Sequence, residues 1–197
     1  MTPRFVPLIL LVAANGAGAE EVARYAAGPG VEVVERREVY DLDAVTLPSL
    51  LEQLDEHLGG AESGDESVGR TVQRIETRYT LDIGADGCHL RDLSVRLRVT
   101  IHLPRWRPSG RRPATLGARW DQMLAALTRH EEGHRDNAVW AARELHRRLA
   151  GLGTAPTCLE LERTVQRERF KMKLRNQQRD RTYDRLTGHG VRQGVVL

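Results

Sequence analysis

The sequence has few of the features that mark specialised classes of protein. It contains two cysteines, its aromatic content is 5%, and Lys plus Arg exceed Asp plus Glu by only three. So small a charge excess does not by itself predict a polyanionic partner. A composition of 40% hydrophobic and 29% charged residues excludes collagen-like, coiled-coil and multi-span membrane proteins. Because domains commonly have about 100–200 residues, a chain of 197 residues is expected to form one main domain.

The longest apolar run lies at the N-terminus and has the pattern of a secretory signal peptide. Arg4 precedes an apolar stretch at residues 5–14, and small residues then lead to Ala17-Gly-Ala19. This stretch is too short to span a bilayer as a permanent anchor. We therefore expect residues 1–19 to be removed after Ala19, which predicts a periplasmic or secreted protein without stable membrane insertion. The alternatives are an N-terminal membrane anchor and a buried helix.

Export gives the two cysteines a predicted role. Thiols that reach an oxidising compartment commonly persist as a disulfide, so we expect Cys88 and Cys158 to be bonded. Closing a loop of about 70 residues between them would stabilise the fold by about 4 kcal/mol on the chain-entropy model. The alternative is two free buried thiols. Metal ligation is disfavoured because neither residue belongs to a Cys-x-x-Cys pair.

Two kinds of periodicity predict the fold class. Apolar and polar residues alternate over residues 75–83 and 93–103, which indicates strands with one buried face, and the turn at 84–87 favours an antiparallel hairpin. A period of 3.6 residues over 116–150 predicts a long helix, and Thr157-x-x-Glu160 is typical of the start of a second. The expected fold is α+β, with an antiparallel β-hairpin or sheet followed by two long helices.

The motif with the clearest chemistry is His130-Glu131-Glu132-Gly133-His134, a His-Glu-x-x-His sequence within the first long helix. Residues i and i+4 of a helix project side by side, so both imidazoles can reach one Zn²⁺ ion. Glu131 lies close enough to act as general base on a water bound to that ion. The alternative is a pair of core histidines. Gly133 costs helical stability relative to alanine, which indicates a close approach at that position.

A zinc site of this kind needs a third protein ligand. We expect His189, because the polar segment 183–190 follows the second helix and an antiparallel return would bring it near the motif. Asp184, Glu160 and Glu162 are the alternatives. Asp184 is otherwise expected to orient a ligating imidazole, and Tyr183 to donate a hydrogen bond to an oxyanion. The alternative for Asp184 is an ordinary acidic residue at a helix end, and the alternative for Tyr183 is a tyrosine that only packs.

Several motifs together resemble a known family. They are Cys88 before a strand, Leu-Pro-Arg-Trp at 103–106, Trp120, the His-Glu-Glu-Gly-His helix, Cys158 and Tyr-Asp-Arg-Leu-Thr-Gly-His-Gly at 183–190. This combination resembles a bacterial domain-of-unknown-function family whose members are described as predicted secreted zinc-dependent proteases. The resemblance covers roughly residues 71–194. It implies a zincin-like metallopeptidase core, with zinc ligands at His130 and His134 and a base at Glu131.

These observations predict three segments and one activity. Residues 1–19 form the signal peptide, 20–70 an N-terminal strand and helix segment with a loop, and 71–197 the metallopeptidase domain. We expect an exported zinc metallopeptidase that acts on a peptide or protein substrate. The alternative is a non-catalytic cell-envelope binding or scaffolding module with a structural metal site. Nine Lys or Arg against three acids over residues 163–185 are interpreted as a solvated helix face, so no nucleic-acid partner is expected; the alternative is a basic helix that binds a polyanion.

Overall fold

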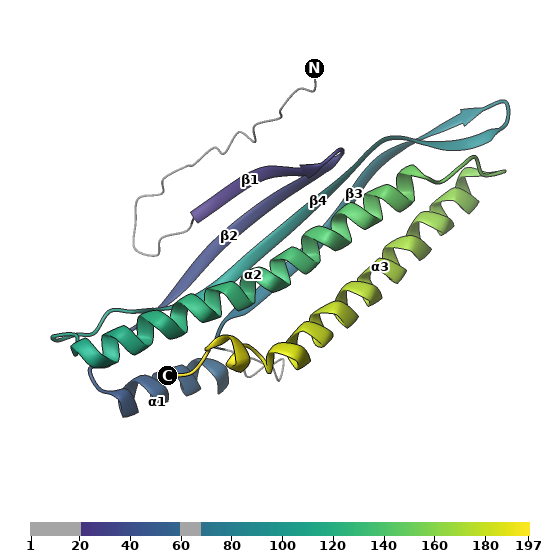
Figure 1. Cartoon of the computed structure of the whole chain (residues 1–197). Coiled ribbons are helices and arrows are strands. Elements are labelled where there is room, and N and C mark those ends of the chain that lie inside the picture. The colour runs from purple at the N-terminus through teal and green to yellow at the C-terminus, as the bar shows by residue number, and fades with distance from the viewer. Residues whose placement is uncertain (1–20, 60–67) are drawn as a thin grey trace, which may run out of the picture.

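The computed structural model describes residues 21–59 and 68–197 and has one mixed four-stranded sheet on which the long helices pack (Figure 1). The strand order is β1-β2-β4-β3, with β1/β2 and β3/β4 antiparallel and β2/β4 parallel. The expected α+β class and the expected antiparallel hairpin are therefore confirmed. The strands are β1 (Glu21–Gly28), β2 (Val31–Leu42), β3 (Arg70–Gly84) and β4 (Gly87–Trp106).

Residues 20–70, expected to hold a short strand, a helix and a loop, contribute half of this sheet. They supply β1 and β2 and then α1 (Leu47–Gly59), while β3 and β4 follow in the chain. The domain boundary expected at residue 70 thus separates strands that belong to one sheet. The predicted signal peptide, residues 1–19, lies outside the described residues.

The two long helices lie on one face of the sheet. They are α2 (Ala114–Ala150) and α3 (Cys158–Thr187), and a short 3-10 turn, η1 (Val191–Gln193), follows. They run antiparallel, since Arg148 pairs with Glu168 near one end and His134 with Asp180 nearer the other (Figure 1). In the described part of the chain, no helix has the length and apolar character needed to cross a membrane.

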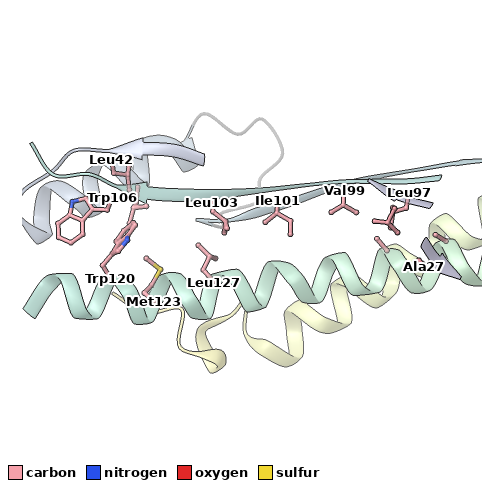
Figure 2. Packing of buried hydrophobic residues seen from close by; sticks show 14 of the residues in the cluster. Ala27, Leu42, Leu97, Val99, Ile101, Leu103, Trp106, Trp120, Met123 and Leu127 are labelled. Carbon is pink, nitrogen blue, oxygen red and sulfur yellow. The ribbon is translucent and has the colours of Figure 1, made fainter. Parts of the chain in front are cut away.

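The main core lies between α2 and the sheet, where Figure 2 shows the buried side chains of β4 facing those of the helix. The alternating residues Leu97, Val99 and Ile101 are buried on this side, as the period of two predicts. Arg96 and Arg98, between them, are not buried. Apolar burial on one face of the sheet thus fixes the position of α2.

The predicted disulfide is confirmed. Cys88 and Cys158 are joined by an S–S bond of 2.02 Å, which ties the start of β4 to the start of α3. Ala155 exchanges two backbone hydrogen bonds with Cys88 beside the disulfide. A disulfide is typical of proteins in an oxidising compartment.

The C-terminal end of α3 differs from the expectation. The helix continues through Thr187 and ends at Gly188, whose left-handed conformation (φ 59°) closes it. Tyr183 and Asp184 therefore lie on the last turns of α3 and not in a segment after it. The predicted start is confirmed, because the Thr157 side chain accepts a hydrogen bond from the Glu160 backbone N–H.

Candidate metal centre

The His-Glu-x-x-His motif lies near the middle of α2, on the side that faces the protein interior. His130 and Glu131 are each only 2% exposed. The rings of His130 and His134 lie 4.9 Å apart, centroid to centroid. The i, i+4 spacing therefore places both imidazoles side by side, as the sequence predicts.

Asp184 of α3 completes a group of three ligand side chains. Its Oδ1 lies 2.9 Å from His134 Nε2 and 3.4 Å from His130 Nε2. Within residues 21–59 and 68–197, these are the residues whose ligand atoms gather for a metal ion, all within 4.8 Å of one another. Nitrogen and carboxylate donors of this kind suit Zn²⁺.

The other ring nitrogen of each histidine is held by an acceptor. His134 Nδ1 lies 3.2 Å from Asp180 Oδ1, and His130 Nδ1 lies 2.9 Å from Gln193 Oε1. Because a carboxylate and an amide oxygen can only accept, each Nδ1 carries the proton. This leaves both Nε2 atoms facing Asp184, which is the orientation that metal-ligating histidines adopt.

The pKa values of the two histidines are shifted in opposite directions. Burial lowers the pKa of His130 below its ordinary value of 6.5, and the neighbouring His134 adds to this effect. Burial also acts to lower the pKa of His134, but the hydrogen bond to Asp180 and the charge of Asp184 outweigh it, so the pKa of His134 is raised. A neutral His130 is ready to bind a cation, whereas a cation must displace a proton from His134 at low pH.

A network of amide groups holds Asp180. Its carboxylate accepts hydrogen bonds from Asn137 Nδ2 at 2.9 Å and from Gln73 Nε2 at 2.8 Å. Asn176 Nδ2 donates to Gln73 Oε1 at 2.9 Å. Side chains from α2, β3 and α3 therefore fix the carboxylate that orients His134.

Glu131 is positioned from the sheet. Thr71 Oγ1 at the start of β3 donates a hydrogen bond to Glu131 Oε2 at 2.7 Å. A Cβ atom at Gly69 would lie 2.8 Å from Glu131 Oε1 and 2.9 Å from Leu127 Cδ1, so a larger residue there would require these side chains to shift. The segment that begins β3 thus restricts the orientation of the Glu131 side chain.

Gly133 allows Tyr183 to pack directly on the motif. A Cβ atom at Gly133 would lie 2.2 Å from the Tyr183 hydroxyl oxygen, which confirms the close approach expected there. The Tyr183 ring stacks on His130 at 5.1 Å, and its hydroxyl accepts a hydrogen bond from Gln193 Nε2 at 3.1 Å. Tyr183 therefore holds both His130 and the residue that orients it.

The histidines, Glu131 and Asp184 line one small pocket of about 160 Å³. His189 also lines this pocket, in a left-handed conformation with φ 52°. Tyr183 lines a different pocket, between α2 and the last turns of α3. The three-residue group contains Asp184, one of the predicted alternatives, and not His189, so this arrangement favours Asp184 as the third ligand.

The remaining candidates are placed elsewhere, and other residues take part instead. Glu160 and Glu162 lie on the first turns of α3, about 33–36 Å along the helix from Asp184 at about 1.5 Å per residue. Asp180 makes the contact expected of Asp184, and it was not singled out in the sequence. Its i, i+4 spacing from Asp184 is a signal that indicates a shared helix face.

The fold and the site define a class, an α+β protein with a His-Glu-x-x-His helix and a candidate metal centre. A family model described as "Bacterial protein of unknown function (DUF922)" matches residues 37–190, and the chain belongs to this family. The expected membership of a bacterial domain-of-unknown-function family is confirmed, and the match extends the resemblance to include the second half of β2 and all of α1. Comparisons with curated proteins and with solved structures gave no match.

Proposed function

We propose that this protein is an exported zinc-dependent metallohydrolase of zincin type, and that it hydrolyses peptide bonds. The observation that carries the proposal is the convergence of ligand atoms of His130, His134 and Asp184 within 4.8 Å of one another, with Glu131 lining the same pocket. Catalytic zinc sites commonly use three protein ligands and keep a further position for water.

The donor set fits the metal on chemical grounds. Two imidazole nitrogens and one carboxylate resemble the His₂Glu set of known zinc peptidases, with aspartate in place of glutamate. When bound, Zn²⁺ would lower the pKa of a coordinated water to about 7 and polarise a carbonyl group. The pocket of about 160 Å³ has room for water beside the three ligands.

The protein side chains divide the remaining work. Glu131 takes the proton of the attacking water and returns it to the leaving amine nitrogen. Thr71 keeps the Glu131 carboxylate turned toward the pocket through its hydrogen bond at 2.7 Å. Asp180 and Gln193 keep the two imidazoles in the tautomer that leaves Nε2 free to bind. In this proposal Tyr183 is a positioning residue, and donation to an oxyanion stays a prediction.

The sheet supports a peptide as the substrate. β3 is an edge strand, since the strand order ends with β4-β3. Its residues Thr71 and Gln73 contact Glu131 and Asp180, so the edge runs directly past the centre. An extended peptide can pair with such an edge through main-chain hydrogen bonds. Export, in turn, is supported by the disulfide between Cys88 and Cys158.

Metal content and hydrolysis test the proposal together. Plasma mass spectrometry of the purified chain should give about one zinc per molecule. His134→Ala and Asp184→Ala should lose the metal, and His189→Ala should keep it. Asp136→Asn, an exposed acid on the same helix, is the matched control.

Hydrolysis of a proteome-derived peptide library should then be abolished by Glu131→Gln with zinc retained. Zinc that is lost in His189→Ala but kept in Asp184→Ala would move the third ligand to His189. Zinc binding without any hydrolysis sensitive to Glu131→Gln would favour the structural metal site of an envelope module.

A further inference from the structure

A second and larger concavity lies between β3 and α3. Its volume is about 550 Å³, and its apolar lining comes from Ile75, Leu145, Phe170 and Met172. Phe170 is 61% exposed, so much of its ring is open to a ligand in this concavity. We call this concavity the β3–α3 groove.

The groove is continuous with the candidate metal centre. Gln73 lines both the groove and the metal pocket. Asn176 also lines the groove, and both amides donate hydrogen bonds to Asp180, the residue that orients His134. A ligand that fills the groove therefore ends beside the centre.

Cations surround the apolar lining. Arg169 and Lys173, one turn apart on α3, line the groove, and Arg74 does so from β3. Among the described residues, neither Arg169 nor Lys173 has a carboxylate within ion-pair distance, whereas Arg74 pairs with Glu76. The groove thus offers two uncompensated positive charges beside an apolar surface.

A buried acceptor marks the end nearest the centre. Asn176 is 6% exposed, and within the described chain its Oδ1 has no hydrogen-bond partner. An unpaired buried acceptor is costly, and a ligand donor would offset that cost once a small shift of Asn176 exposed this oxygen to the groove. A peptide supplies such donors as backbone N–H groups.

We infer that the β3–α3 groove binds a flanking segment of the substrate chain, and that it selects a bulky apolar residue accompanied by acidic residues. Met172 lies 12 residues before Asp184 on α3, which is about 18 Å of helix. An extended chain covers this distance in about five residues. The selected residues therefore lie about five positions from the bond that is cut. This inference rests on the proposed peptidase function for its link to cleavage.

Binding is tested without hydrolysis by using the full chain with Glu131→Gln. The probe is a fluorescein-labelled peptide of Gly and Ser that carries one Phe and three Glu. Two counterparts replace the Glu residues by Lys or the Phe by Ser. Fluorescence anisotropy should show that the acidic Phe peptide binds most tightly and that added salt weakens it.

Charge reversal locates the binding. The double variant Arg169→Glu with Lys173→Glu should lower the affinity for the acidic peptide by about tenfold. The control variant, Arg163→Glu with Arg167→Glu, should leave this affinity within about twofold of the parent value. The control pair has the same spacing on the same helix but does not line the groove. Phe170→Ser should lower the affinity only for the peptides that carry Phe.

The outcomes separate the two proposals. Equal binding of the Lys peptide, equal weakening by both reversals, or no binding of any probe would overturn the groove assignment, whatever the chain hydrolyses. Absence of hydrolysis by the zinc-loaded parent chain would overturn the peptidase function alone. Library cleavage without enrichment of acidic residues about five positions from the cut would overturn the selection that we assign to the groove.

Discussion

Replacing Gly133 by alanine gives the sharpest test of how the candidate centre is packed. In a helix interior, alanine is ordinarily favoured over glycine by about 1 kcal/mol. Here a Cβ atom would lie 2.2 Å from the Tyr183 hydroxyl oxygen and 2.3 Å from its Cζ. Tyr183 must therefore move away from α2, against the normal gain in helix propensity.

The cost follows from the contacts that Tyr183 would lose. Its hydrogen bond with Gln193 contributes about 1 kcal/mol, and its stacking on His130 contributes about 0.5–1.5 kcal/mol. Overpacking of this kind commonly costs about 1–3 kcal/mol. The two lost contacts cost about 1.5–2.5 kcal/mol together, and the propensity gain offsets about 1 kcal/mol of this, so Gly133→Ala should lower the free energy of unfolding by about 0.5–1.5 kcal/mol.

A double-mutant cycle measured by urea unfolding checks this reasoning. In a Tyr183→Ala background the clash is absent, so the same glycine substitution should raise the free energy of unfolding by about 1 kcal/mol. Gly117→Ala, elsewhere on α2, is the matched control, because its nearest contact is the flexible end of Arg112. Zinc affinity should also fall by about tenfold in Gly133→Ala, since Gln193 loses its support.

A stabilised Gly133→Ala chain with unchanged zinc affinity would refute the reasoning. It would mean that Tyr183 can move away at no cost, and that the stacked ring does not hold His130. The same gain in stability in both Tyr183 backgrounds would lead to the same conclusion, because the two residues would then be independent.

Three further predictions concern other parts of the molecule. Cys88→Ser should lower the free energy of unfolding by up to about 4 kcal/mol, measured by chemical denaturation, because the disulfide closes a long loop. Zinc should be retained, because the disulfide lies at the start of α3, far from the centre. In the proposed hydrolysis, Thr71→Val should lower kcat by about tenfold with zinc content unchanged, because Glu131 loses the hydroxyl that orients it. An unchanged kcat would exclude this role. Asp180→Asn should weaken zinc affinity by about 10–100-fold. In the metal-free chain it should also destabilise more at about pH 5.5 than at about pH 8.5, because the raised pKa of His134 contributes stability that is present below 6.5 and is lost as the pH rises through the folded-state pKa.

The parts of the fold that local periodicity determines could be predicted from the sequence. The β3/β4 hairpin and both long helices follow from alternation and from the 3.6-residue period, and each is present. The parallel pairing of β2 with β4 could not be predicted, because β2 does not alternate cleanly. Val33, Val34 and Glu35 are buried in succession, and Glu35 is tolerated because Arg37 and Arg135 lie beside it.

The same division applies to the candidate site. His130, Glu131 and His134 are recognisable because a helical spacing relates them. The placement of Asp184 required knowing that α3 continues to Thr187, because this residue then lies on the face of α3 that is turned toward the motif. No local pattern connects Gln193 or Thr71 to the motif, since tertiary packing alone brings them there.

The hydrogen bonds around the motif join residues that lie far apart in the chain, and this affects when the centre can form. Thr71 precedes Glu131 by 60 residues, while Gln193 follows His130 by 63. Contacts that close such long loops are acquired late in folding, because the loss of chain entropy precedes the gain. During synthesis, α2 is complete while the residues that orient its histidines have still to be made. A nascent chain therefore carries the His-Glu-x-x-His sequence without an assembled centre, and the chemistry proposed for it begins only once the residues through Gln193 have emerged and folded.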